Sequence, residues 1–396
     1  MKTARNLEDI KAMVYACTQC GYCRDKYSDE VFTELPVFRV CPVREHSGGF
    51  EHHYARGKIQ IAQGILEGRF PYSPELIELL YTDPDCRLCT WVCHAEPVLD
   101  PTLVWRAMRQ DIVAAGLGPP GPLKDIDSRV AQRRNVFGAR TDRRSRWAER
   151  LELPPTGDVL YFAGCHACYP QPEIARATVA ILKGAGIGVA YLGEEEWCCG
   201  VVQFHDGSIS IAREMADHNL EAIKASGAEK VVTACAECYK SLNVEYPQIF
   251  GEMPFEVVHV SQVLAEFLSS GKLSLPKGLA ERRMTYHDPC QLGRYCGVYE
   301  QPRQVLRGIP GVELVEMQRR REYAWCCGNG ADLVKSMDAG LALEITYDRV
   351  EEAREAGAEA IVTCCPRCTA GLRQVAEGIG VYDFSVVVAR AMGLKA

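Results

Sequence analysis

Short apolar stretches alternate with longer amphipathic segments through most of the C-terminal two thirds of this chain. Residues 159–162, 230–233, 284–287 and 360–363 have the length and composition of buried strands. The segments between them are long enough for helices, so the pattern predicts parallel α/β layers joined by right-handed crossovers. The first 115 residues favour helices instead, for example at 74–81 and 103–114.

The C-terminal part contains an internal repeat. Residues 212–238 match residues 342–368 at an offset of 130, and ten residues are identical in the two copies. Each copy is predicted to contain a strand, a helix, a strand, a long amphipathic helix and a short strand that ends at a C-x-x-C motif. Open α/β sheets bind ligands beyond the carboxyl ends of their strands, so a functional site is expected at these cysteines.

Length and local composition predict several domains in this chain of 396 residues. The fold class is therefore mixed, α+β and α/β: a helical N-terminal domain at 1–115 precedes two α/β repeats at 156–275 and 280–396. Residues 116–122 (GLGPPGP) cannot continue a helix, and a cysteine-free basic segment follows them. We interpret 116–155 as a solvated, partly helical linker; the alternative is a docking surface for an acidic partner.

Charge and hydropathy exclude several classes of protein. The net charge of −7 gives no electrostatic basis for binding nucleic acid. No apolar run reaches the ~18–20 residues that span a bilayer, and the first 16 residues lack the apolar core of a signal peptide. We expect a cytoplasmic location, where thiols stay reduced. The 20 cysteines then indicate metal binding rather than disulfides.

The first cysteine run has the spacing of a bacterial-type ferredoxin. Cys17, Cys20 and Cys23 are separated by two residues each, which lets the backbone curl around three corners of a [4Fe–4S] cube. Gly21 relieves crowding where the backbone approaches the cluster. The cysteine that is followed by proline, Cys41, comes after a gap of 17 residues rather than three.

A second run follows at Cys86, Cys89 and Cys93. It matches the end of the ferredoxin pattern, with Asp83 at the position of the first cysteine and His94 at the position of the proline. Since the last cysteine of each run binds the other cube, the first cluster is assigned to Cys17, Cys20, Cys23 and Cys93. The second is assigned to Cys41, Cys86 and Cys89, with Asp83 either as an oxygen ligand or beside a three-iron cluster. The alternative for these motifs is a zinc site.

Each repeat supplies five further cysteines from three separate strand-end loops. They are Cys165, Cys198, Cys199, Cys235 and Cys238 in the first copy, and Cys290, Cys326, Cys327, Cys365 and Cys368 in the second. Neighbouring side chains diverge, so adjacent cysteines favour a larger, bridged cluster, and the glycine after each pair permits a sharp turn. A vicinal disulfide or a thioredoxin-like C-x-x-C is the competing redox interpretation.

These motifs resemble the D-type catalytic component of heterodisulfide reductase and its relatives. The resemblance rests on WCCG, present twice, on TACAEC and TCCPRC, and on the N-terminal two-run ferredoxin pattern, from Cys17 to Cys368. It implies two noncubane [4Fe–4S] clusters, each held by five cysteines, facing one another across a pocket between two CCG domains. It also implies that two cubane clusters deliver the electrons. Asp83 and His94 depart from the pattern.

A few remaining residues are candidates for supporting roles. His166 and His287 lie near Cys165 and Cys290 and are candidate proton donors to a thiolate product; a histidine bonded to backbone is the alternative for each. Cys168, Cys296 and Cys364 fall outside the motifs and are interpreted as buried structural thiols.

Three functions fit these features. The first is reduction of a disulfide at the noncubane clusters, and the second is electron transfer for a flavin-dependent 2-hydroxyacid or glycerol-3-phosphate dehydrogenase. The third is a relay in a flavin-based bifurcating complex. The chain lacks a Gly-rich dinucleotide fingerprint, so a partner must supply electrons. The expected partners are a flavin subunit, resembling heterodisulfide reductase A or an electron-transfer flavoprotein, and a ferredoxin or a membrane cytochrome subunit that would attach the protein to a membrane.

Overall fold

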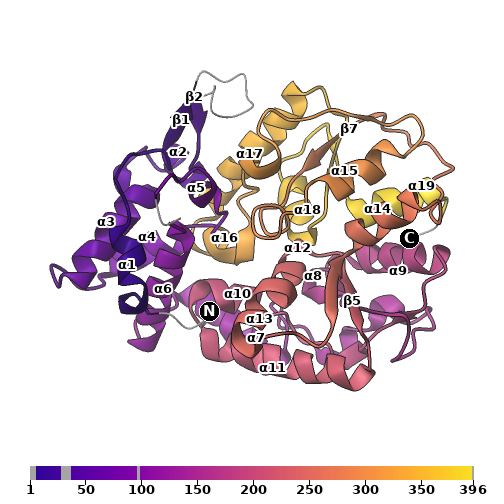
Figure 1. The fold of residues 1–396 in the computed structure, drawn as a ribbon, viewed down its shortest axis with the longest axis horizontal. Helices are drawn as coiled ribbons and strands as arrows, with labels where there is room; N and C mark the ends of the chain where they lie inside the picture. Colours follow the sequence, from indigo (N-terminus) through magenta and orange to yellow (C-terminus); the bar gives the residue numbers. More distant parts are fainter. Residues whose placement is uncertain (1–5, 28–36, 96–98, 395–396) are drawn as a thin grey trace.

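The computed structural model describes residues 6–27, 37–95 and 99–394. In Figure 1 the N-terminal residues, in indigo and purple, form a helical unit on one side of the two repeats. The first repeat, in magenta and red, lies below the second, in orange and yellow. In the described part of the chain, none of the helices has the length and apolar character needed to cross a membrane.

The N-terminal unit consists of short helices and one small antiparallel sheet. Its elements are η1 (Glu8–Ile10), α1 (Lys11–Tyr15), β1 (Asp25–Tyr27), β2 (Val37–Arg39), α2 (Pro42–Glu45), η3 (Glu51–His53), α3 (Ala55–Leu66), α4 (Pro74–Tyr81), α5 (Leu88–Trp91) and α6 (Pro101–Ala114). Helix α4 has the predicted bounds. Helix α6 begins two residues before the predicted start, because the Asp100 carboxylate accepts from Thr102 N–H and Pro101 occupies the first helical position.

The basic segment after α6 packs on the first repeat. It contains α7 (Gly121–Arg133), η4 (Thr141–Arg143) and η5 (Arg146–Ala148), which confirms a partly helical segment. It is not wholly solvated, however, since Arg144 is buried and its guanidinium lies 3.0 Å from the Glu196 carboxylate. The segment differs from the predicted solvated linker because Arg144 pairs with a buried carboxylate, Glu196, of the first repeat. The basic composition of the segment does not show where that carboxylate lies.

The first repeat is built on a four-stranded parallel sheet in the order β4-β3-β5-β6. Its elements are β3 (Val159–Tyr161), α8 (Gly164–Cys168), α9 (Pro172–Gly184), β4 (Val189–Ala190), η6 (Gly193–Glu195), α10 (Val201–Asp206), α11 (Ile209–Ser226), β5 (Lys230–Thr233), α12 (Ala236–Lys240), a π-helical turn η7 (Ser241–Glu245), α13 (Tyr246–Phe250), β6 (Glu256–His259) and α14 (Val260–Ser269). The predicted strands are confirmed as β3 and β5.

The second repeat has the corresponding parallel sheet, in the order β8-β7-β9-β10. Its elements are β7 (Arg283–His287), α15 (Glu300–Arg307), β8 (Glu313–Leu314), η8 (Arg321–Tyr323), η9 (Gly330–Asp332), α16 (Leu333–Met337), α17 (Ala339–Glu355), β9 (Ala360–Thr363), α18 (Pro366–Arg373), β10 (Gly380–Asp383) and α19 (Phe384–Met392). The predicted strands are confirmed as β7 and β9.

At the join, helices of each repeat pack on helices of the other. Helix α19 of the second repeat packs on α9 of the first, and α14 of the first packs on α15 of the second. At the first of these contacts, the Thr178 hydroxyl donates to Ser385 Oγ over 3.0 Å. The join is therefore reciprocal, and it brings the carboxyl edges of the two sheets toward one another.

Candidate functional site

The cysteines of each repeat gather at the carboxyl ends of its two central strands. Cys165 follows β3 and lies in α8, while Cys235 follows β5 and occupies the position just before α12. Cys290 follows β7, and Cys365 follows β9 and occupies the position just before α18. Parallel strands place these ends at one edge of a sheet, which explains how distant positions in the sequence meet.

Within the first repeat the five thiols lie in hydrogen-bonding contact, one after the next. Cys165 contacts Cys198, Cys198 contacts Cys199, Cys199 contacts Cys238, and Cys238 contacts Cys235. The hydrogen bond from Cys198 lowers the pKa of Cys165 to about 7. A buried group of five thiols with such contacts suits a multinuclear sulfur-bridged cluster.

The second repeat repeats this arrangement. Cys290 contacts Cys326, which contacts Cys327; the sulfurs of Cys327 and Cys368 are 3.2 Å apart, and Cys368 contacts Cys365. All twenty cysteines lie among the described residues, and each is a free thiol.

Two further contacts connect these groups to each other and to the N-terminal unit. The Cys235 thiol of the first repeat contacts Cys365 of the second. Cys86 of the N-terminal unit contacts Cys326, and this hydrogen bond lowers the pKa of Cys86 to about 7. We call the continuous series from Cys165 through Cys235 and Cys365 to Cys326 and Cys86 the sulfur row.

A glycine in the left-handed region follows each cysteine pair. Gly200 has φ +78° and Gly328 has φ +74°, so both turns need a residue without a Cβ. A Cβ on Gly328 would lie 2.6 Å from the Ala342 carbonyl oxygen, whereas a Cβ on Gly200 would be 3.4 Å from Ala212. The turn is therefore tighter in the second repeat.

Replacing Gly328 by alanine should disturb the second repeat more than Gly200→Ala disturbs the first. Both substitutions carry the left-handed conformational cost of about 1–2 kcal/mol, but only Gly328→Ala also forces the backbone of α17 to move. We expect Gly328→Ala to lose iron from its repeat, measured by iron analysis of the purified protein, and Gly200→Ala to retain it. Equal iron in both variants would contradict this.

The first N-terminal cluster site is a cavity. Cys17, Cys20, Cys23 and Cys93 all line it, with Gly21 between them. Gly21 has φ +87°, as the crowded turn requires, and a Cβ there would lie 3.3 Å from the Arg56 guanidinium. The structure thus brings together the four cysteines assigned to the first cluster; their binding to iron stays a prediction.

The second N-terminal site gathers Cys41, Cys86, Cys89 and Asp83. Burial raises the pKa of Cys41 to about 12, and the charges of Lys58, Asp83 and Cys86 act on it as well. The Asp83 carboxylate forms a buried ion pair with Lys58 and accepts from Asp85 N–H over 2.9 Å. Lys58, which the sequence did not single out, thus holds Asp83; whether Asp83 also binds iron stays a prediction.

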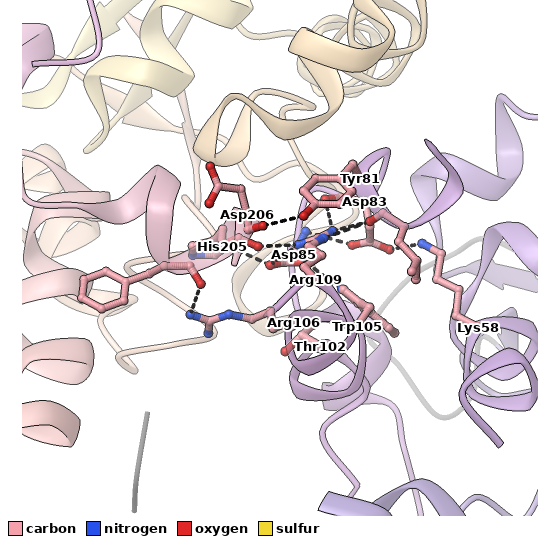
Figure 2. A network of polar contacts seen from close by, with 12 residues as sticks. Lys58, Tyr81, Asp83, Asp85, Thr102, Trp105, Arg106, Arg109, His205 and Asp206 are labelled. Carbon is pink, nitrogen blue, oxygen red and sulfur yellow. Dashed lines mark hydrogen bonds and ion pairs between the residues drawn. The ribbon is translucent and has the colours of Figure 1, made fainter. Parts of the chain in front are cut away.

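Asp85 anchors this second site to the first repeat, as Figure 2 shows. Its carboxylate accepts from Arg109 at 3.0 Å and from Trp105 at 2.6 Å, and it pairs with His205 Nδ1 at 2.8 Å. His205 lies in α10, the helix that follows the Cys198–Cys199 pair and Gly200, and the side chains of Asp85, Arg109 and His205 are fully buried. The network therefore fixes the loop before Cys86 relative to the first repeat.

A buried cation beside the sulfur row indicates that the row carries negative charge. The Arg294 guanidinium donates to the carbonyls of Cys86 at 2.6 Å and of Ala324 at 2.7 Å. Among the residues that the structure describes, no carboxylate pairs with Arg294, and the thiols of Cys86, Cys290 and Cys326 are among the groups that raise its pKa despite its burial. Thiolates of a metal cluster provide the charge that such a buried guanidinium needs.

The residue after the first cysteine of each repeat also has unsatisfied polar atoms. Both ring nitrogens of His166 and both amide atoms of Gln291 are buried, and they have no hydrogen-bond partner within the described ranges. Burial lowers the pKa of His166 to about 4, so its ring is neutral near pH 7. Buried polar groups are normally satisfied, so this pattern fits a site that takes up a further group.

The other candidate histidine, His287, lies at the sulfur row. One ring nitrogen of His287 and the sulfurs of Cys327 and Cys368 are within 4.8 Å of one another. His287 is fully buried at the end of β7. His94, at the position of the missing proline, instead contacts Lys26 Nζ at 2.5 Å in the N-terminal unit.

Two of the three cysteines outside the motifs contact tyrosine hydroxyls. Cys168 lies 3.6 Å from the Tyr191 hydroxyl, and Cys364 contacts Tyr286. Cys296 is half-buried, and burial raises its pKa to about 12. Their interpretation as structural thiols stays a prediction.

Ion pairs of the two repeats were not predicted from the sequence. Glu196 accepts from Ala163 and Gly164 N–H at 2.7 and 2.9 Å, which holds the turn before Cys165. Glu237 and Arg367 occupy the same position in the two C-x-x-C motifs and pair across the repeats at 2.7 Å. The opposite charges at these repeat-related positions were the one signal in the sequence that could have indicated this contact.

Comparison with known proteins agrees with this architecture of paired cysteine-rich domains in an iron–sulfur oxidoreductase. The cysteine-rich domain family CCG matches residues 159–243 and 284–373. The chain is 35% identical to the D-type component of dihydromethanophenazine:CoB–CoM heterodisulfide reductase from Methanosarcina barkeri, over 99% of this chain and 97% of that protein.

The corresponding component from Methanosarcina mazei is 38% identical over the same shares of the two chains. The EtfAB:quinone oxidoreductase of Syntrophomonas wolfei is 31% identical over 80% of this chain and 47% of its own length. The chain therefore belongs to the family of the D-type heterodisulfide reductase component, whose members are parts of iron–sulfur oxidoreductases.

Proposed function

We propose that the chain holds four iron–sulfur clusters at the sites just described. Two cubane clusters would be held by Cys17, Cys20, Cys23 and Cys93, and by Cys41, Cys86 and Cys89 with Asp83. Two noncubane clusters would be held by the five cysteines of each repeat. When bound, such clusters supply one-electron transfer at potentials tuned by their surroundings. Soft thiolate ligands in this number support iron–sulfur clusters over hard metals.

The observation that carries the proposal is the contact of Cys86 with Cys326. It puts the second N-terminal site directly against the site of the second repeat, and Arg294 bonds the backbone of both at this junction. From there the contact of Cys365 with Cys235 leads to the first repeat. The N-terminal unit is therefore the proposed entry for electrons, and the join between the repeats is their destination.

We propose a disulfide as the electron acceptor at this join. Reduction of R–S–S–R′ takes two electrons and two protons and yields two thiols, RSH and R′SH. Cys235 and Cys365 belong to different repeats and meet at the join, so each repeat can receive one of the two sulfurs. The two protons come from solvent, because the His166 ring is neutral near pH 7 and Nδ1 of His287 already accepts from Arg349. Each ring lies next to cysteines of one repeat, and its proposed role is to hydrogen-bond the thiolate product.

A second candidate function is electron transfer alone. The similarity to an EtfAB:quinone oxidoreductase favours this function, with an electron-transfer flavoprotein as the partner. For disulfide reduction, the proposed partners are a flavin subunit resembling heterodisulfide reductase A, and a ferredoxin or a membrane cytochrome subunit. A cytoplasmic location, with attachment to a membrane through a partner, is part of the same proposal.

Metal content and spectroscopy test these proposals on anaerobically purified protein. Four clusters correspond to about fifteen or sixteen irons per chain, the lower number if the Asp83 corner lacks iron. In the oxidised protein, a thiol product should produce a new one-electron EPR signal if the repeats take up sulfur. Stoichiometric zinc with fewer than about ten irons would contradict the four clusters. A spectrum indifferent to every thiol, with normal electron flow to a flavoprotein, would establish the second candidate.

A further inference from the structure

The His287 ring has a buried arginine as its hydrogen-bond partner. Arg349, in α17, is fully buried, and its Nε donates to His287 Nδ1 over 3.0 Å. Its Nη1 donates to the Arg319 carbonyl at 2.7 Å and pairs with Glu352. The guanidinium is thus fixed from two sides, and one of its N–H groups is directed at the imidazole.

This contact determines which nitrogen of His287 carries the proton. A guanidinium has donors only, so Nδ1 must accept, and a neutral imidazole then has its proton on Nε2. One ring nitrogen lies near the sulfurs of Cys327 and Cys368, and Nε2 is the nitrogen that the bond from Arg349 leaves available to them. A protonated Nε2 has no lone pair for a metal. His287 is therefore a hydrogen-bond donor toward these sulfurs and not an iron ligand, although the three groups are close enough to hold an ion.

The first repeat has no counterpart of this donor pair among its described residues. Phe162 stands three residues before Cys165, as His287 stands before Cys290, and it is buried. Asn219 stands where the repeat places Arg349, and its side chain binds Trp197 N–H, the Cys198 carbonyl and the Tyr246 hydroxyl instead. The two sites thus have the same five thiols but different hydrogen bonding.

We propose that Arg349 is a positioning residue that holds His287 as the Nε2–H tautomer, and that the resulting N–H···S bond makes the noncubane cluster of the second repeat easier to reduce than that of the first. The inference rests on the proposed clusters. Its physical basis is that hydrogen bonds to cluster and ligand sulfur stabilise the reduced, more negative state and raise the reduction potential. The potential difference favours electron arrival first at the repeat that contacts Cys86.

The test is an EPR-monitored redox titration of the iron-loaded full-length protein, with signals assigned by comparison with Cys198→Ala and Cys326→Ala. Arg349→Met removes the donor, and the second-repeat cluster is expected to shift to a lower midpoint potential while the other clusters stay unchanged. Arg349→Lys keeps a donor, so its midpoint potential should lie between those of the wild-type protein and Arg349→Met. Arg319→Met is the matched control, since Arg319 pairs with the same Glu352. An unshifted potential in Arg349→Met with full iron content would overturn the inference.

A measurement on the wild-type protein does not depend on how the variants fold. With ¹⁵N-labelled histidine, hyperfine spectroscopy of an odd-electron state of the second-repeat cluster should show the weak coupling of a hydrogen-bonded nitrogen. The strong coupling of an iron-bound nitrogen would overturn the tautomer assignment. Absence of iron from the second repeat would instead contradict the proposed function, so the two failures are distinguishable.

Discussion

Replacing Cys326 by alanine is expected to remove the cluster of the second repeat and to abolish disulfide reduction with artificial electron donors. Cys326 contacts three thiols, Cys290, Cys327 and Cys86, so its loss removes a ligand and also interrupts the sulfur row where the N-terminal unit joins it. Iron analysis should show about four irons fewer per chain. The EPR signal of the first cubane cluster should persist, because Cys17, Cys20, Cys23 and Cys93 line a separate cavity.

Cys296→Ala provides the matched control for this variant. Cys296 belongs to the same repeat and is half-buried, and the charged groups that act on it in the described part of the chain are Lys240, Arg87 and Glu245 rather than thiols of the sulfur row. It should keep full iron and activity. If Cys326→Ala retained the iron of the wild-type protein, or if Cys296→Ala lost as much, the assignment of ligands in the second repeat would be wrong.

Arg109→Met is expected to lower the free energy of unfolding by about 3–5 kcal/mol, the usual cost of leaving one buried charge without its partner. Arg109 and Asp85 are both inaccessible to solvent, and the guanidinium also donates to the carbonyls of Leu80 and His205. Its loss leaves the Asp85 carboxylate with hydrogen bonds to Trp105 and His205 but without its direct ion pair. Because Asp85 precedes Cys86, the iron of the second N-terminal site should become labile as well.

Chemical denaturation of the iron-loaded protein, followed by circular dichroism, measures the loss of stability. Arg24→Met is the control, since Arg24 pairs with Asp25 at the surface and exposed pairs contribute about 0–1 kcal/mol. A midpoint for Arg109→Met that matches Arg24→Met would show that the buried network in Figure 2 does not hold the N-terminal unit on the first repeat.

Local patterns in the sequence were enough to predict the central strands and the cysteine chemistry. Strands at 230–233 and 360–363 were predicted with their observed bounds, because short apolar runs between amphipathic helices leave few alternatives. The internal repeat predicted that two similar units carry the same five cysteines. Local spacing is sufficient to predict these features, because a C-x-x-C motif and the glycine after a cysteine pair depend only on residues that are neighbours in the sequence.

The way these parts meet depends on tertiary packing. The predicted repeats extend to residues 275 and 396, but no element was predicted after either C-x-x-C motif; in the structure β6 and β10 complete the sheets there, and α14 and α19 pack on the opposite repeat. The contacts of Cys86 with Cys326 and of Arg349 with His287 join residues 240 and 62 positions apart. Such contacts depend on how whole layers of the structure pack against one another. Because a buried charge is stable only when it is paired, the packing also determines which charged residues are buried as pairs. The spacing of residues along the chain does not show how the layers pack or which buried charges pair.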